Sequence, residues 1–242
     1  METIRDLPLS ELAIRRYQAI ATLEKYGLDY CCHGDRSLEE SCREKNLNIA
    51  DVEDEIRRSH QTENPNPSSG FENMELNLLV DHILQVHHAF LRRQIPVISE
   101  HLSKVSTKHG DNHHEVKEIT YCFAKLRSEI EYHMRKEEEI LFPYICFLAE
   151  AASKGESINP PPFQSIRNPI RMMESEHEVA GDILKEIRKW SNNFQVPGDA
   201  CTTFQVTYKE LEEVEKDLHM HIHLENNILF PRSIELEKEL LK

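Results

Sequence analysis

The chain is poor in the residues and patterns that mark several classes of protein. It has only 7 glycines and one tryptophan in 242 residues, and aromatic residues make up 7% of it. No run of about 18 apolar residues is present, so we expect no membrane-spanning helix. The N-terminal segment Met1–Leu7 has neither the basic start nor the apolar stretch of a signal peptide. We therefore predict a cytoplasmic protein.

Positive charge is also scarce. The chain has 29 Lys and Arg against 43 Asp and Glu, for a net charge of −14. This balance argues against nucleic acid and against anionic membranes as partners. Without an export signal, we expect the six cysteines to be mostly reduced thiols.

The residues that are abundant, above all Glu, Leu, Ile and Lys, favour helices. Hydrophobic residues make up 39% of the chain, enough to fill the core of one large domain with or without a small appendage. The segment Gln61–Gly70 collects Pro, Ser and Gly, which is typical of a linker. We therefore divide the chain into a small helical module at 1–60, a linker at 61–73 and a main domain at 74–242.

The small module is expected to contain three short helices. Helical spacing over Leu12–Tyr26 predicts a first helix that Gly27 ends. Ser37 and Glu40 have the spacing of a capping box at the start of the second helix. Val52 and Ile56 mark the third.

The main domain shows four long segments with helical periodicity, and none of it resembles a strand. The breaks between them fall at 106–112, at 155–162 and at 196–198. Each segment places a histidine on its apolar stripe. The first stripe contains Leu84, His88, Leu91 and Ile95, and the second contains His133, Glu137 and Ile140. We predict an all-α fold, an up-down-up-down four-helix bundle.

One phrase of the main domain occurs twice. His133-Met-Arg-Lys-Glu137 is followed by Leu-Phe-Pro, and so is His221-Ile-His-Leu-Glu225, 88 residues later. Four residues turn through about 400° on an α-helix, so each His and Glu lie roughly 40° apart on one face. A metal ion needs such a pair of ligands, and the repetition suggests two metals in one symmetric site.

The two glutamates, each one turn from a histidine on an apolar stripe, carry this argument. A single histidine on an apolar face is usually a core residue, but a glutamate is almost never buried without a partner. Four imidazoles and two carboxylates give each of two metals two nitrogens and two oxygens if both carboxylates bridge. A bridging oxide or hydroxide adds a fifth ligand and leaves one position open. Such donors suit iron or manganese, whereas structural zinc prefers four ligands and often thiolate. The candidate donors are His88, His133, Glu137, His177, His221 and Glu225.

Two assignments stay open at this point. Periodicity favours His88 as the donor of the first segment, but His87 fits almost as well. Glu174 and His177 have the Glu-x-x-His spacing of carboxylate-rich di-iron bundles, without a second copy elsewhere. We interpret Glu174 as a carboxylate that supports the site from outside or moves.

These motifs together resemble a known family. Asp29-Tyr30-Cys31-Cys32, His88, the two repeated phrases and Met173-Glu174-Ser175-Glu176-His177 are similar to the RIC family of iron–sulfur cluster repair di-iron proteins. The main domain looks like a hemerythrin-like domain, and the small module looks like the N-terminal domain of ScdA-type members. The resemblance covers nearly the full length of the chain.

The resemblance implies a non-haem centre of two iron ions bound by the six candidate donors, with His88 rather than His87. It also implies a role in restoring iron–sulfur clusters damaged by nitrosative or oxidative stress, by supplying labile iron. The partners would be damaged iron–sulfur proteins and small ligands such as NO or O2. We expect a metal-donating repair protein rather than a turnover enzyme. A di-iron NO or peroxide reductase and an O2 or NO carrier or sensor remain alternatives, and a homodimer is one open choice of oligomeric state.

Cys31 and Cys32 are candidates for a thiol role: redox chemistry, NO capture or iron transfer. We expect them in a turn before a helix start, which would lower a thiol pKa. The alternative is that two small residues simply pack a tight turn. The resembling family commonly continues Cys-Cys-Gly-Gly, whereas this chain has His33 and Gly34, which leaves the shape of the turn open. Cys42 and His33 are a weaker candidate for a Cys/His site.

Overall fold

The structure, a computed structural model, describes residues 4–59 and 71–241. Most of the expected linker lies outside the described residues. The chain divides into two compact units: Met1–Glu75 with Ile222–Pro231, and Leu76–His221 with Arg232–Lys242. In the described residues, no helix combines the length and the apolarity that a membrane span requires.

The N-terminal segment forms four helices after a short 3-10 turn at Ile4–Asp6. They are α1 (Leu9–Arg15), α2 (Ala19–Lys25), α3 (Leu38–Glu44) and α4 (Ile49–Ser59). The expectation of one helix over Leu12–Tyr26 is wrong, because Arg16 leaves helical geometry with φ −138° and ψ 72°. Leu12 and Leu23 are both fully buried, so each half is held by its own apolar residues.

Two local signals in this segment are confirmed. Ser37 Oγ accepts a hydrogen bond from Glu40 N at 3.2 Å, and Glu40 Oε2 accepts one from Ser37 N at 3.1 Å. This is the capping box that begins α3. Gly27 follows α2 with a φ of +62°, which suits glycine.

Gly34 fixes the loop between α2 and α3. A Cβ at this position would lie 2.4 Å from the Tyr30 carbonyl oxygen and 2.8 Å from Ser10 Cβ. The backbone N–H and the hydroxyl of Ser10 both donate to the Gly34 carbonyl, at 2.9 and 2.8 Å. The close approach excludes any side chain at position 34 and anchors the loop to α1.

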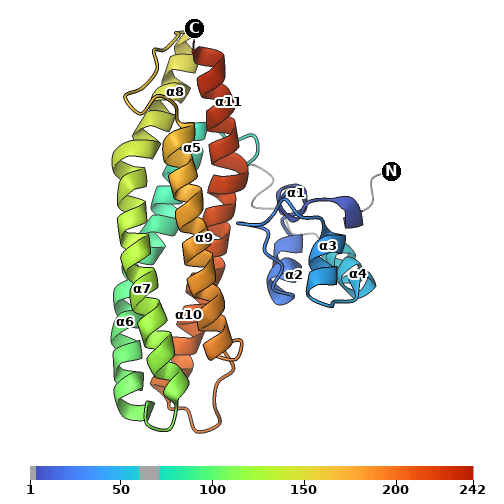
Figure 1. The fold of residues 1–242 in the computed structure, drawn as a ribbon, viewed down its shortest axis with the longest axis vertical. Coiled ribbons are helices and arrows are strands. Elements are labelled where there is room, and N and C mark those ends of the chain that lie inside the picture. The colour runs from blue at the N-terminus through green and yellow to red at the C-terminus, as the bar shows by residue number, and fades with distance from the viewer. Residues whose placement is uncertain (1–3, 60–70, 242) are drawn as a thin grey trace. The chain divides into compact units, whose positions relative to one another are not determined.

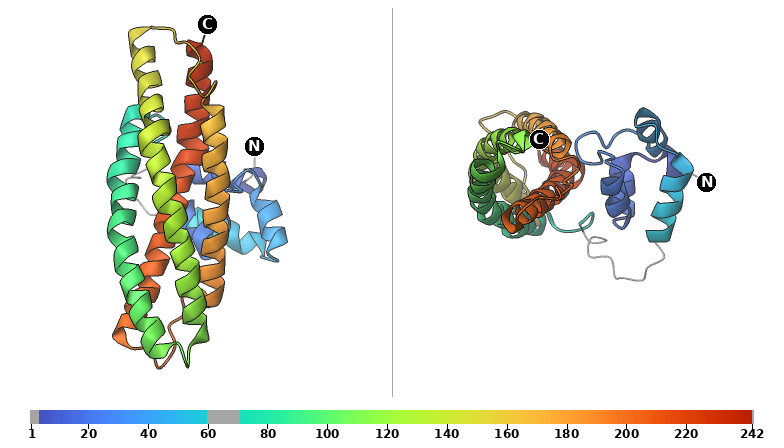
Figure 2. Two further views of the ribbon diagram at one scale, coloured as in Figure 1. Left: turned by 60° about the vertical axis from the view of Figure 1, so that its left-hand side comes forward. Right: turned by 90° about the horizontal axis from the view of Figure 1, so that it is seen from below.

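Four long helical rods form the bundle, confirming the predicted all-α architecture (Figure 1). The end-on view in Figure 2 shows these rods around a common axis. The described residues contain no strand, only two isolated bridges. In chain order the rods are α5 (Leu76–His82), η2 (Ile83–His88) and α6 (Ala89–His109); α7 (His114–Lys136), η3 (Glu137–Leu141) and α8 (Phe142–Lys154); α9 (Arg167–Trp190); and α10 (Thr202–Leu224), η4 (Glu225–Leu229) and α11 (Phe230–Leu240).

Three turns of these rods, η2, η3 and η4, are π-helical, so that backbone hydrogen bonds span five residues instead of four. The wider turn changes which residues face inward. Ile83 is fully buried while Leu84 is only half-buried, and Leu141 is buried while Ile140 is 49% exposed. The predictions that placed Leu84 and Ile140 on the buried stripe are wrong for this reason.

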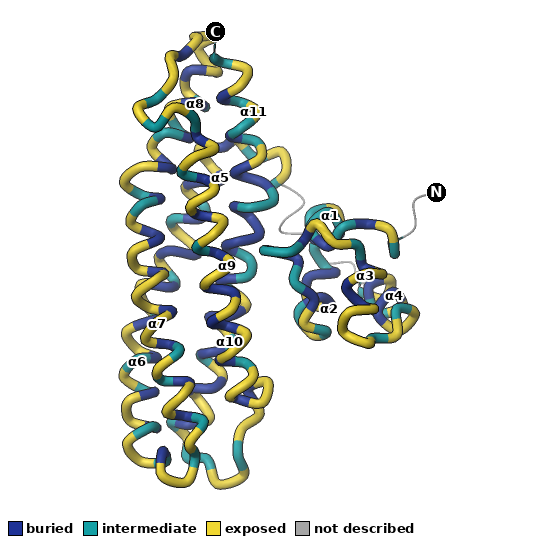
Figure 3. Tube along the Cα trace, viewed as in Figure 1, coloured by how far each residue is buried: buried dark blue, intermediate teal, exposed yellow. Residues whose placement is uncertain are grey.

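The apolar core fills one half of the bundle, between α6, α7, α9 and α10. Buried positions recur as dark stripes along each long helix (Figure 3). Phe123, Phe204 and Tyr208 are among its largest buried side chains. Each such side chain contributes roughly 1.5–3 kcal/mol by leaving water. Helix α6 runs to His109, so the break expected from residue 106 begins too early.

A polar cluster around Glu237 lies in the other half of the bundle. The buried carboxylate of Glu237 accepts hydrogen bonds from Tyr144 Oη at 3.0 Å, Ser165 Oγ at 2.7 Å and Ile166 N at 2.9 Å. Ile166 caps α9, so the negative charge also lies at the positive end of that helix. The connection between α8 and α9 is thereby tied to α11.

Candidate metal centre

Each rod of the bundle contributes to a single buried cluster of donor atoms. His88 ends η2, His133 lies on α7, His177 on α9 and His221 on α10. Glu137 begins η3, the π-helical turn after α7, and Glu225 begins η4, the π-helical turn after α10. All six side chains are buried, and both glutamates are fully so. The structure therefore brings together all the donors that spacing selected.

The cluster consists of two overlapping groups. One joins His88 and His221 with both glutamates, and the other joins His133 and His177 with the same two glutamates. Within each group the donor atoms lie within 4.8 Å of one another. The two carboxylates are thus shared between the groups, as bridging ligands would be.

Distances between donors support this arrangement. The Nε2 atoms of His88 and His221 are 3.2 Å apart, and those of His133 and His177 are 3.0 Å apart. Glu137 turns Oε2 to His88 Nε2 at 3.3 Å and Oε1 to His133 Nε2 at 3.2 Å. One carboxylate therefore offers one oxygen to each group.

These spacings fit metal ions. Ligands at right angles on bonds of about 2.1 Å lie about 3.0 Å apart. Buried carboxylates also need a compensating positive charge, since desolvation of an ion costs several kcal/mol. The donor set is nitrogen and oxygen without sulfur, which suits a metal of intermediate hardness.

Two outer carboxylates orient the cluster. His88 Nδ1 lies 2.6 Å from Glu138 Oε1, and His133 Nδ1 lies 3.0 Å from Glu176 Oε2. A carboxylate at Nδ1 holds the proton there and leaves the Nε2 lone pair facing the interior. Each carboxylate also meets a cation: Arg92 at 2.5 Å from Glu138, and Lys136 at Glu176.

The same contacts set the pKa values of these carboxyls. Burial alone would raise the pKa of Glu138, but the hydrogen bonds from Arg92 and His88 outweigh it and lower that pKa. Burial is likewise outweighed at Glu176, whose pKa is lowered by His133 and Lys136. Both groups therefore remain ionised acceptors near neutral pH.

Sequence reasoning missed both outer carboxylates. It singled out Glu174, which is exposed, whereas Glu176 makes the contact to His133. The motifs do hold a weak signal, because Glu138 directly follows Glu137 and Glu176 directly precedes His177. That signal does not identify the partners, since Glu138 contacts His88 across η3 and η2 and Glu176 contacts His133 across α9 and α7.

His87 lies beside the cluster but in neither donor group. It is buried, its Nδ1 lies 3.0 Å from Asp217 Oδ1, and its ring stacks on that of His221 with 5.5 Å between the ring centres.

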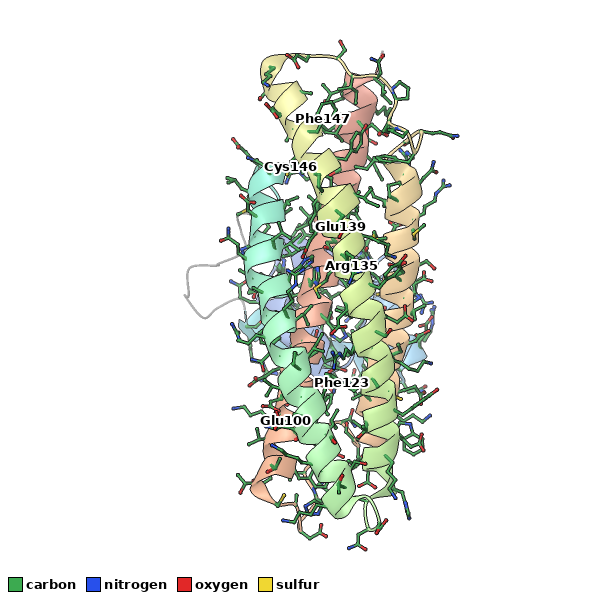
Figure 4. All side chains as sticks on the ribbon, turned by 90° about the vertical axis from the view of Figure 1, so that its left-hand side faces the viewer. Glu100, Phe123, Arg135, Glu139, Cys146 and Phe147 are labelled. Carbon is green, nitrogen blue, oxygen red and sulfur yellow. The ribbon has the colours of Figure 1, made fainter. Side chains whose placement is uncertain are left out.

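A surface cavity of about 380 Å³ between α6 and η3 is lined by Arg92, Arg135, Glu138 and Glu139, among others. Arg135 and Glu139 are labelled on this face in Figure 4. The cavity thus reaches the carboxylate that holds His88.

Comparison with known proteins identifies the family. Residues 79–233 match the hemerythrin HHE cation binding domain, and residues 5–60 match a domain of unknown function, DUF542. The chain is 36% identical over 230 residues to "Iron-sulfur cluster repair protein YtfE" of Escherichia coli O157:H7 and, at the same identity, of Shigella boydii serotype 4. Each match covers 95% of this chain and 97% of the relative. The chain belongs to the YtfE family. The resemblance stated from its motifs is confirmed.

In this YtfE family member the vicinal cysteines lie in the loop between α2 and α3. Their Sγ atoms are 3.8 Å apart, and all six cysteines of the chain are free thiols. The expectation of a lowered thiol pKa is wrong for Cys31, because α3 begins only at Leu38. The hydrogen bond with Cys32 and burial instead raise the pKa of the Cys31 thiol.

The residues around the cysteines form a third donor group, made of Asp29, Cys31 and Cys32. His33 contacts this group through Asp29, with Nδ1 and Oδ2 3.0 Å apart. Cys42 is buried in α3 and does not belong to the group.

Proposed function

We propose that the buried cluster holds two iron ions and that the protein supplies this iron to iron–sulfur clusters damaged by nitrosative or oxidative stress. The observation that carries the proposal is the pair of donor groups that share Glu137 and Glu225. The name of the relatives, iron-sulfur cluster repair protein, supports the function.

His88 and His221 would bind one ion, and His133 and His177 would bind the other. Both glutamates would be ligands of both ions. Bound iron would supply an exchangeable divalent or trivalent cation for delivery. The donors come from four separate rods, so a small shift of one rod separates the ligands of an ion. This arrangement supports release better than a set of ligands on one loop would.

The wider context follows from the same proposal. The partners are damaged iron–sulfur proteins, NO and O2 are small ligands of the site, and the protein acts in the cytoplasm. Cys31 and Cys32, in the small module at 1–60, take a thiol role, and the bundle at 74–242 holds the iron. These domain limits stay predictions from the sequence.

The test measures iron content and iron transfer together. The full chain is loaded with Fe²⁺, and iron per chain is measured before and after incubation with an iron–sulfur protein that lacks its cluster, in a buffer that supplies inorganic sulfide and a thiol reductant but no iron. We expect two irons per chain and regeneration of the client's cluster. Glu137→Gln should hold fewer than two irons, because it loses the shared carboxylate, and Glu139→Gln, an exposed neighbour, should match the unaltered protein.

Two results would contradict the proposal. One is an unaltered protein whose iron never reaches the client. The other is sustained consumption of NO or peroxide with an electron donor, lost in Glu137→Gln, which would replace iron supply by an enzymatic function.

A further inference from the structure

The loop between α2 and α3 presents a donor group chemically unlike the buried cluster. Cys31 and Cys32 place their sulfurs 3.8 Å apart, and Cys31 Sγ lies 3.4 Å from Asp29 Oδ1. The donor atoms of these residues all lie within 4.8 Å of one another. Two sulfurs and one oxygen favour a softer metal than the nitrogens and oxygens of the bundle.

The distances match a tetrahedral metal site. Zinc–sulfur bonds of about 2.3 Å at the tetrahedral angle place two sulfurs about 3.8 Å apart, and a sulfur and a carboxylate oxygen about 3.6 Å apart. The observed 3.8 and 3.4 Å lie close to both values. A disulfide would instead need the sulfurs about 2.05 Å apart. The thiols are therefore spaced for chelation.

His33 holds the carboxylate in place. Its Nδ1 lies 3.0 Å from Asp29 Oδ2, while Asp29 Oδ1 accepts a hydrogen bond from Cys32 N at 3.0 Å and faces the Cys31 sulfur. A partner on the far oxygen of a ligand carboxylate is a common way to orient it. The anchoring of Gly34 to Ser10 fixes the same loop from its other side.

We propose that Asp29, Cys31 and Cys32 bind one divalent cation of the zinc type, with His33 as the positioning residue. Three protein ligands leave the fourth tetrahedral position for an exchangeable ligand, as in catalytic rather than structural zinc sites. Access is from the side of Cys32 and His33, since Cys32 is half-buried and the His33 side chain is 41% exposed. This site goes beyond the proposed iron supply and does not depend on it.

Cobalt distinguishes this site from the bundle. Co²⁺ is added to the metal-free, reduced full chain, and the near-ultraviolet absorption of thiolate-to-cobalt charge transfer is recorded. We expect this band to reach the intensity of one thiolate-bound Co²⁺ per chain, whatever further Co²⁺ the bundle takes up, and to disappear when Zn²⁺ is added. The bundle cluster cannot produce it, because its donors are nitrogen and oxygen alone.

Variants assign the band to the loop. Cys32→Ser should remove it, whereas Cys201→Ser should keep it. Cys201 is the fair control because it is also half-buried and lies beside a histidine, with His109 Nε2 at 3.2 Å. His33→Gly, the residue common in the family, should keep the band but weaken Co²⁺ binding about 10- to 100-fold. Circular dichroism confirms that each variant is folded.

The outcomes are separable from those of the iron proposal. A band that is absent from the unaltered protein, or unchanged in Cys32→Ser, overturns the site. Equal affinity in His33→Gly overturns the role of His33. Iron content is measured in the same preparations, so a loss of two-iron loading with an intact cobalt band counts against iron supply only.

Discussion

Glu138 and Glu176 extend the histidine cluster outward by one hydrogen bond each. Each accepts from Nδ1 of a candidate ligand and is itself held by a cation near the surface. The histidines they hold, His88 and His133, belong to different donor groups. Each proposed ion would therefore have one imidazole that is oriented from outside.

Replacing Glu138 by Gln should speed the release of iron. The amide lacks the charge that keeps the proton on His88 Nδ1, so the imidazole becomes a poorer and less oriented ligand. We expect release to a chelator about 10- to 100-fold faster. Stopped-flow absorption of the chelate measures this rate.

Glu139→Gln is the matched control, because Glu139 lines the same cavity and is exposed. Equal release rates from the Glu138 variant and the unaltered protein would show that the outer carboxylate does not hold the site.

For the individual residues of the site, the sequence predicted the six donors but not the two carboxylates, Glu138 and Glu176, that contact them from outside. The His-x-x-x-Glu spacing lies within one helix, so it could be read directly, and the structure brings all six donors together. Their role as metal ligands stays a prediction. Glu176 could not be distinguished from Glu174, since the choice depends on how α9 is rotated against α7.

The π-helical turns are the main feature at the scale of elements. One ends at His88 and the other two begin at Glu137 and Glu225. The helical spacing of apolar residues predicted the long helices. It could not predict the π-helical turns, because one widened turn shifts only a few positions of that spacing. The break between α1 and α2 was missed for a similar reason, because apolar residues continue in helical spacing across it.

Deleting Ile140 should convert η3 into an ordinary α-helical turn. Ile140 is 49% exposed, so its loss removes little from the core, and the flanking helices can stay in phase. We expect unchanged helicity, equal or higher thermal stability of the metal-free protein, and reduced iron content because Glu137 is displaced. Circular dichroism and metal analysis test this, and a deletion variant that still holds two irons would contradict it.

His113, the residue that precedes α7, links the start of that helix to the connection between α9 and α10. Its Nδ1 lies 2.8 Å from Glu115 Oε1, and its Nε2 lies 3.1 Å from Asp199 Oδ1 in the connection between α9 and α10. Both ring nitrogens therefore face carboxylates. The hydrogen bonds with Glu115 and with Asp199 raise the pKa of His113.

This raised pKa predicts a pH-dependent contribution to stability. It is fully present below the unfolded pKa of about 6.5 and is lost as pH rises through the higher folded pKa. The difference in unfolding free energy between the unaltered protein and His113→Gln should therefore shrink from about pH 5.5 to about pH 8.5. Urea unfolding measures it.

His114→Gln provides the comparison, since His114 is the exposed neighbour. If the loss of unfolding free energy in the His113 variant is constant over this pH range, the ion pairs of His113 do not contribute to stability.

The whole molecule carries a net charge of −14. Such a charge attracts cations over distances set by ionic strength, about 10 Å at 0.1 M salt. The cavity at Glu138 is lined by two arginines, Arg92 and Arg135, and by three glutamates, Glu131, Glu138 and Glu139, so its local charge is close to balanced and does not oppose the overall charge.

The overall charge should accelerate the uptake of iron. We expect the association rate of Fe²⁺ with the metal-free protein to fall when salt rises from about 0.02 to about 0.3 M. Stopped-flow mixing measures the rate. Binding of uncharged NO to the iron-loaded protein should not change with salt, and a salt-independent rate for Fe²⁺ would show that local groups govern its approach.

The two positions that follow the vicinal cysteines differ in their freedom to change. Position 34 is closed to every side chain by the Tyr30 carbonyl and by Ser10, whereas His33 keeps an ordinary negative φ and points its ring partly to solvent. A substitution at residue 33 can therefore be accommodated without a change in the loop backbone, whereas one at residue 34 cannot. If the loop binds a metal as proposed, residue 33 is the position at which its affinity can be tuned without loss of the fold.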